Sequence, residues 1–371
     1  MRGTPESGRN RTGSTLKDVA ARAGVSTFTV SRALNNRTGV APATRDRVIE
    51  VANDLSYRPN PFAQSLRRQS SSTISVLTAN RQNLFYALLI SSLERELRQH
   101  GFSFLVTDAV LDGELIADRE RQFVSEAVAH KALVALLTYQ VAPESLDELI
   151  ASGIECIFVD VPPTPGYEHL VSVRGDSFAG AKEVAAHLLQ HRYGGPWLFV
   201  GLPPQWVAVR GRLDGFRAGA KEGGIDVVDI EASNDALRTA DSVAVYLAGQ
   251  LKEGRRLPRA VFTANELILQ GTLLALRRFD LRIPLDMAVI SYDDFSWAAF
   301  VDPPVTVFDQ RIPEIARLVS MFISRAAGAE QHDSTTPPGR SELVPGLFRA
   351  RTSCGCSFRP SLGAAEQDPT F

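Results

Sequence analysis

Hydrophobic residues recur at helical spacing in two short segments near the start of the chain. In the first segment the apolar positions fall at i, i+3, i+4 and i+7, which places them on one face of a helix. Thr15 and Asp18 stand where a capping box would begin that helix, and Gly24 supplies the backbone freedom that a tight turn requires. The apolar face consists of Leu16, Val19, Ala20 and Ala23.

The second segment predicts a helix with Ser26 as its N-cap. Small polar groups, an aromatic ring and one arginine occupy its outward positions. Such a helix fits the major groove of DNA, where an arginine can bond two acceptors of a guanine. An ordinary helical hairpin on a protein surface shows the same pattern, so the hairpin alone leaves both interpretations open. The inward residues are Val30, Ala33 and Leu34, and the outward residues are Thr27, Phe28, Ser31 and Arg32.

Two more helical patterns follow the hairpin. Residues 42–55 predict an amphipathic helix with Pro42 in its first turn, where the missing N–H costs nothing. Asn60 can cap, and Pro61 can open, one more short helix that ends in Arg67 and Arg68. A helix of about two turns is marginal alone in water, so something else must order it.

From Thr73 onward, buried apolar runs alternate with amphipathic stretches, and the pattern restarts after Asp176. This alternation predicts an α/β fold with parallel sheets covered by helices on both faces. The restart predicts two similar lobes with a cleft between them. The predicted strands are 73–77, 103–106, 133–137, 156–159, 197–200, 260–262 and 288–291, and the predicted helices are 85–100, 118–130, 143–152, 178–191, 212–222 and 267–279.

Charge is unevenly distributed along the 371 residues. Residues 1–70 hold twelve Arg and Lys against five Asp and Glu, a net charge of +7; the whole chain carries −2, so residues 71–371 carry −9. A basic N-terminal segment followed by an acidic remainder suits a protein whose N-terminal module faces DNA phosphates.

No apolar stretch is long enough to cross a membrane, and residues 1–13 lack a secretory signal. We expect residues 1–13 to be a disordered tail. We also expect a cytoplasmic protein, because the three cysteines form no framework of disulfide pairs.

The sequence shows no catalytic or metal motif. His187 and His191 are four residues apart on a predicted helix, but Leu188 stands where a zincin needs a glutamate. Cys354 and Cys356 could bind a metal or oxidise, yet two ligands at that spacing without histidine partners are weak evidence. No nucleophile elbow, phosphate loop or Cys–His pair stands out. We therefore predict no enzyme, no cofactor and no metal site.

Polar side chains follow several predicted strands at their carboxyl ends, where open α/β sheets bind ligands. Asp160, Asn265 and Asp293 occupy such positions, and Arg212 stands at the entry of a predicted helix. Carboxylates, an amide and an arginine suit a polyhydroxylated ligand, because each hydroxyl both donates and accepts. Taken singly, each residue could instead cap a helix or order a loop.

Several separated motifs of residues 15–68 together resemble the headpiece and hinge of the lactose-repressor (LacI/GalR) family of bacterial transcription regulators. A looser resemblance extends to about Ser353. The matching pieces are Leu-Lys-Asp-Val-Ala (16–20), Ala-Gly-Val-Ser (23–26), Thr-Val-Ser-Arg-Ala-Leu-Asn (29–35), Thr-Arg-Asp-Arg-Val (44–48), Tyr-Arg-Pro-Asn (57–60) and Ala-Gln-Ser-Leu-Arg (63–67).

The resemblance implies a domain order. A helix-turn-helix headpiece would occupy 14–59, a hinge helix and linker 60–72, and a flexible tail 357–371. Between them, residues 73–356 would form a periplasmic-binding-protein-like core of two doubly wound parallel-sheet lobes. The chain would cross between the lobes three times, with lobe one at about 73–174 and 310–338 and lobe two at about 175–309 and 339–356.

It also implies a homodimer, or a higher oligomer, that binds palindromic double-stranded operator DNA. The hinge helices would enter the minor groove, where Leu66 would wedge between base pairs. The implied DNA-binding residues are Ser26, Thr27, Phe28, Ser31, Arg32, Arg45, Asn60, Leu66 and Arg67.

A small effector, a sugar or sugar derivative, would bind between the lobes and release a repressor from DNA. Either Phe85 or Trp297 could stack on its apolar face. Three positions depart from the family's pattern, because Glu266 replaces an Asp, Ser177 an Asn, and Ala41 a Ser or Thr cap. The implied effector-binding residues are Asn83, Phe85, Asp160, Arg212, Asn265, Asp293 and Gln310.

Three alternatives stay open. The effector could be a corepressor that tightens DNA binding, because the same machinery permits the opposite sign. A periplasmic solute-binding protein would share the core fold, but it needs a signal peptide and no basic headpiece. A sugar-converting enzyme would need an acid/base pair, for which only Asp160 and Asp293 offer themselves.

Overall fold

The computed structural model describes residues 15–34, 39–55, 57, 72–80, 82–111, 114–203, 206–328 and 341–356. Contacts divide the chain into two compact units, residues 1–70 and 71–371. No helix in these described ranges is both long and apolar enough to span a bilayer.

The described part of the first unit contains three helices around a small apolar core. Thr15 and Asp18 form the predicted capping box of α1, in which the Thr15 hydroxyl accepts from the Asp18 N–H at 3.3 Å and the Thr15 N–H donates to the Asp18 carboxylate at 2.7 Å. Gly24 ends α1 with a φ of +65°, which allows the tight turn to α2. The helices are α1 (Leu16–Ala23), α2 (Thr27–Leu34) and α3 (Pro42–Asp54), and Val19, Val30 and Val48 are fully buried between them.

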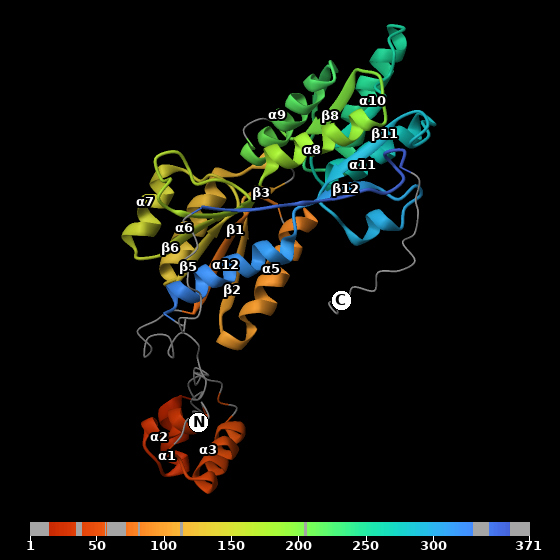
Figure 1. The fold of residues 1–371 in the computed structure, drawn as a ribbon. Helices are drawn as coiled ribbons and strands as arrows, with labels where there is room; N and C mark the ends of the chain where they lie inside the picture. The colour runs from red at the N-terminus through yellow and green to blue at the C-terminus, as the bar shows by residue number, and fades with distance from the viewer. Residues whose placement is uncertain are drawn as a thin grey trace, which may run out of the picture. The chain divides into compact units, whose positions relative to one another are not determined.

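Lobe one of the second unit is a parallel sheet in the order β13-β7-β6-β5-β1-β2 (Figure 1). Strand β1 pairs with β2 on one side and β5 on the other, so that Val76 lies opposite Val106 and Leu136. The strand order changes direction at β1, and right-handed crossovers therefore put α5 and α6 on opposite faces. Helix α12 packs beside α5, and α7 packs beside α6. The strands are β1 (Thr73–Thr78), β2 (Ser103–Asp108), β5 (Val134–Leu137), β6 (Glu155–Val159), β7 (Val171–Gly175) and β13 (Ser341–Val344), and the helices are α5 (Leu84–Leu97), α6 (Ala117–Ala129), α7 (Pro143–Ala151) and α12 (Ile312–Ala326).

Lobe two repeats this design with the order β14-β12-β11-β10-β8-β9. Only β14 is antiparallel to its neighbour in this sheet. Helices α8 and α9 pack together, as do α10 and α11. The strands are β8 (Trp197–Gly201), β9 (Val227–Glu231), β10 (Ala260–Thr263), β11 (Ala288–Tyr292), β12 (Thr306–Asp309) and β14 (Leu347–Arg349), and the helices are α8 (Ser177–Gln190), α9 (Val207–Glu222), α10 (Ala236–Lys252) and α11 (Glu266–Arg278).

Three crossovers join the lobes. The chain leaves lobe one after β7, returns to it between β12 and α12, and leaves it again between β13 and β14. The prediction that residues 339–356 belong to lobe two is wrong for Ser341–Val344, because this segment forms β13 and pairs with β7 in lobe one. The last crossover therefore follows Val344.

Candidate functional site

The outward face of α2 carries the residues predicted to read DNA. Ser26 precedes the helix, and its hydroxyl accepts from the Thr29 N–H at 3.1 Å, so Ser26 acts as the predicted cap. Phe28 is 67 % exposed, and the Arg32 guanidinium lies 5.5 Å from the centre of its ring. Phe28 thus supports one side of the arginine that is expected to contact bases.

The other DNA-contact predictions fall on α2, α3 and the hinge. Thr27 and Ser31 are partly exposed on α2, and Arg45 is partly exposed on α3. Ala41 begins α3 without a side-chain hydrogen bond, in accord with the missing Ser or Thr at that position. Three hinge predictions, Asn60, Leu66 and Arg67, lie outside the described residues.

A cavity of about 750 Å³ lies between the two lobes of the core. Residues at the ends of strands and at the beginnings of helices in both lobes form its wall. Lobe one contributes Asn83, Phe85 and Asp160, and lobe two contributes Arg212, Asn265 and Asp293. Six of the seven predicted effector residues therefore line one space.

Asp160 and Asp293 occupy equivalent positions in the two lobes. Asp160 follows β6 and Asp293 follows β11, with left-handed φ values of +69° and +73°. The Asp160 N–H donates to Val173 O at 3.1 Å, and the Asp293 N–H donates to Phe308 O at 2.8 Å, each on the adjacent strand. A positive φ at a residue other than glycine is strained and concentrates at functional sites, which favours the binding role over a loop-ordering one.

Arg212 lies in α9 and reaches from lobe two toward lobe one. Its Nη1 donates to Ala264 O at 2.5 Å, and its guanidinium lies 3.9 Å from the centre of the Tyr292 ring. Its Nη2 lies 3.6 Å from Asp160 Oδ1. This buried ion pair is a direct electrostatic link between the two lobes.

Burial dominates the electrostatics of this cluster. Desolvation raises the pKa of Asp160 to about 6 and that of Asp293 to about 7, although Arg212 attracts both carboxylates and opposes the shift. Desolvation disfavours the Arg212 cation as well, but Asp293 and Asp160 more than offset this and raise its pKa. Both carboxyl groups therefore change protonation state near neutral pH, while Arg212 stays charged.

The two predicted asparagines have a structural role as well. Asn83 Oδ1 accepts from the Phe85 N–H at 3.0 Å, and Asn265 Oδ1 accepts from the Ile268 N–H at 3.0 Å. They cap α5 and α11, so the side-chain NH₂ is the group that each can offer to a ligand. Phe85 is buried and is part of the cavity wall.

Gln310 and Trp297 are not among the described residues that line the cavity. Gln310 lies at the crossover after β12, and its Nε2 donates to Asp293 Oδ1 at 2.5 Å, so it orients a lining carboxylate from behind. Trp297 Nε1 instead donates to Glu266 Oε1 at 2.8 Å. Glu266, the replacement for the family's aspartate, is buried by this contact.

Four more residues that line the cavity include one from the predicted segment 83–86 and three that sequence reasoning missed. Tyr86 donates from its hydroxyl to Asp160 Oδ2 at 3.3 Å, and its ring meets Phe85 edge-on. From lobe two, Trp206, Asn234 and Arg238 also face the cavity. Tyr86 belongs to the segment 83–86, which the family resemblance places opposite the carboxylates, whereas the other three lie in segments where no element was predicted to begin.

Buried polar atoms without a described hydrogen-bond partner cluster at this cavity. They include Asp160 Oδ1, Arg212 Nε and Asn234 Oδ1. A buried polar atom without a hydrogen bond costs free energy, so a ligand with several hydroxyl groups would satisfy these atoms.

Two family models match the chain. "Bacterial regulatory proteins, lacI family" matches residues 15–60, and "Periplasmic binding protein-like domain" matches residues 197–354. The Escherichia coli ribose operon repressor is 29% identical over 315 residues, which cover 84% of this chain and 92% of the repressor. The PurR transcriptional repressor of Haemophilus influenzae is 28% identical over 342 residues, which cover 90% and 97% of the two chains.

Among solved structures, the Lac repressor dimer bound to operator and the anti-inducer ONPF superposes with a TM-score of 0.75 at 23% identity. The match covers 92% of this chain and 99% of that one, and it shows the shared fold. The two matched domains stand in the order that the residues predicted. The chain therefore carries a DNA-binding domain of the lacI family of bacterial regulatory proteins at residues 15–60 and a periplasmic binding protein-like domain at residues 197–354.

Proposed function

We propose that this regulator is a repressor that binds a palindromic operator as a homodimer and is released by a polyhydroxylated small molecule. The ligand binds in the cavity between the lobes. The observation that carries the proposal is the wall of that cavity, where the described residues include two carboxylates, two arginines and five side-chain amides around a space of about 750 Å³.

The ligand class follows from the polar groups. Buried carboxylates accept from hydroxyls, Arg212 donates to hydroxyl or ring oxygens, and the asparagine NH₂ groups donate as well. Phe85, Tyr86 and Trp206 supply apolar surface for carbon faces. A sugar or sugar derivative has both kinds of surface. The similarity to a ribose operon repressor supports the same class.

The release mechanism follows from where the charged groups lie. Arg212 in lobe two and Asp160 in lobe one interact directly across the cavity. A ligand that hydrogen-bonds both replaces this contact and changes the preferred separation of the lobes. Only such differential affinity for two arrangements can shift the regulator between DNA-binding states.

The site is tested by a thermal-shift screen of sugars and sugar derivatives, read on the intact protein. A ligand at 100 times its dissociation constant stabilises the folded state by about 2.7 kcal/mol. Arg212→Ala should lose the shift. Arg217→Ala is the matched control, because Arg217 lies on the same helix, is exposed, and pairs with Asp229 away from the cavity.

Arg212→Ala and wild type responding alike would place the ligand elsewhere. A ligand that stabilises the protein but tightens operator binding would make the effector a corepressor. Chemical conversion of the sugar during the incubation would identify an enzyme instead.

A further inference from the structure

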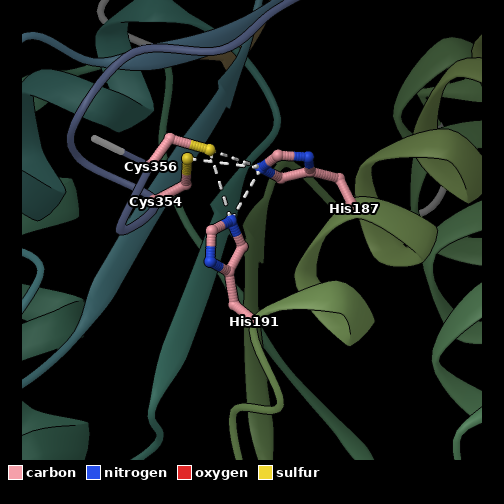
Figure 2. Close-up of side chains that lie close together, drawn as sticks. All are labelled: His187, His191, Cys354 and Cys356. Carbon is pink, nitrogen blue, oxygen red and sulfur yellow. Dashed lines mark hydrogen bonds between the residues drawn. The ribbon is translucent and has the colours of Figure 1, made fainter. Parts of the chain in front are cut away.

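Two histidines and two cysteines from distant parts of the chain meet on lobe two (Figure 2). His187 and His191 lie one turn apart at the end of α8, and Cys354 and Cys356 follow β14. The four ligand atoms all lie within 4.8 Å of one another. None of the four residues lines the cavity between the lobes, so the cluster is separate from the effector site.

The spacing of these atoms matches that of ligands around one metal ion. Zinc bonds of about 2.05 Å to nitrogen and about 2.3 Å to sulfur put tetrahedral ligands about 3.3 Å (N to N) and about 3.6 Å (N to S) apart. The Nε2 atoms of His187 and His191 are 3.1 Å apart. His187 Nε2 lies 3.3 Å from Cys354 Sγ and 3.6 Å from Cys356 Sγ, which in turn lies 3.4 Å from His191 Nε2.

We propose that His187, His191, Cys354 and Cys356 bind one Zn²⁺ ion. Two neutral imidazoles and two thiolates are a zinc ligand set, and the two cysteines release their protons to solvent when the ion binds. Four protein ligands make a closed, structural site rather than a catalytic one. The bound ion ties the end of the core, after β14, to helix α8.

The surrounding residues hold the two sulfurs in place. Gly355 separates the cysteines with a φ of +94°, and a Cβ atom there would lie 2.4 Å from the Tyr193 hydroxyl. That hydroxyl donates to Cys354 O at 3.0 Å. The turn therefore needs glycine between the cysteines, and it is fastened to the segment that follows α8.

A second contact orients and polarises the Cys354 sulfur. The Thr306 hydroxyl donates to Cys354 Sγ at 3.0 Å and accepts the Arg351 N–H at 2.8 Å. Such outer partners fix first-shell ligands and stabilise a thiolate. The His187 ring packs on Phe348 of β14, with ring centres 4.4 Å apart, which fixes its direction as well.

Metal-free alternatives explain less of this geometry. Hydrogen bonds among neutral side chains need only pairs of atoms, whereas here both Nε2 atoms and both sulfurs converge on one point (Figure 2). A disulfide between Cys354 and Cys356 would involve the two sulfurs, but it would not explain why both imidazole rings direct a nitrogen toward them.

The test is metal content of the full-length chain, purified under reducing conditions without chelator and after removal of any affinity tag. After dialysis with Zn²⁺ and then against metal-free buffer, we expect one zinc per chain by elemental analysis. Cys356→Ser and His191→Gln should each lose most of it. Cys156→Ser is the matched control, because Cys156 is a buried cysteine of lobe one whose Sγ contacts Ile154 O, and it should retain one zinc.

Cobalt provides a second readout that depends on ligand geometry. Wild type and Cys156→Ser with Co²⁺ should show the strong visible absorption of a tetrahedral ion and a sulfur charge-transfer band, and Cys356→Ser should weaken both. Circular dichroism confirms that each variant is folded. The proposal is overturned if folded wild type retains no zinc, if both ligand variants retain as much as wild type, or if Cys354 and Cys356 are joined by a disulfide in the protein purified under reducing conditions.

Discussion

At the scale of single residues, two of the acidic side chains that line the cavity stand at backbone positions with an unusual conformation. Asp160 and Asp293 hold positive φ values at the ends of equivalent strands. Their place after a buried apolar run was predictable from sequence. The partners of Asp293 and Arg212 were not, because Gln310 and Ala264 reach them from other segments of the chain.

The raised pKa of Asp293 makes a prediction about pH. The group's pKa is about 7 in the folded protein against 3.8 in its usual state, so the folded state holds the extra proton between these values. Stability from this group is therefore lost as pH rises from about 4 to about 7 and is constant above that. Asp293→Asn removes the penalty, and its melting temperature relative to wild type should rise from pH 5 to pH 8. A constant difference would contradict the assigned shift.

The α2 surface makes a prediction about DNA. Arg32→Ala should weaken operator binding by about 1–3 kcal/mol and relax the base preference at one position of each half-site. Arg45→Ala should weaken binding to all sequences alike and reduce its salt dependence, because a phosphate contact carries no sequence information. Binding to a panel of operator variants measures both. An unchanged preference in Arg32→Ala would mean that another residue reads that base.

At the scale of elements, the alternation of strands and helices was predictable wherever a strand is buried. Strand β9 was missed because it is an edge strand with Asp229 and Glu231 on its exposed side. Helix α10 was missed because Leu237, Val245 and Leu251 are exposed, which blurs its apolar stripe. Helix α9 begins at Val207, five residues before the predicted start, and these first residues are mostly apolar.

Close packing of α8 and α9 makes a stability prediction. A Cβ atom on Gly215 would lie 2.1 Å from Phe178 O, so Gly215→Ala must force the helices apart and should destabilise the core by about 1–3 kcal/mol or more. Gly249 in α10 has open space around its Cβ position, and Gly249→Ala should stabilise by about 0.5–1 kcal/mol. Urea unfolding of both variants decides the matter. Equal effects would show that α8 and α9 are less closely packed.

At the scale of the whole molecule, the two-lobed fold and the headpiece were predictable, because separated motifs and a restarted pattern are visible along the chain. The position of the last crossover between the lobes was not predictable. Strand β13 pairs with β7 across more than 160 residues, and nothing local in Ser341–Val344 indicates that partner. The meeting of His187 and His191 with Cys354 and Cys356 depends on the same long-range path, so each pair alone was weak evidence for a metal.

The central claim is that ligand binding between the lobes controls operator occupancy. The most direct measurement is fluorescence anisotropy of an operator duplex, selected from randomised DNA, titrated with protein in the presence and absence of the sugar found by thermal shift. We expect the sugar to weaken operator binding by wild type and Arg217→Ala by at least about tenfold, a coupling of about 1.4 kcal/mol. Arg212→Ala should bind the operator as tightly as wild type and ignore the sugar. Identical operator affinity of wild type with and without saturating sugar would contradict the account.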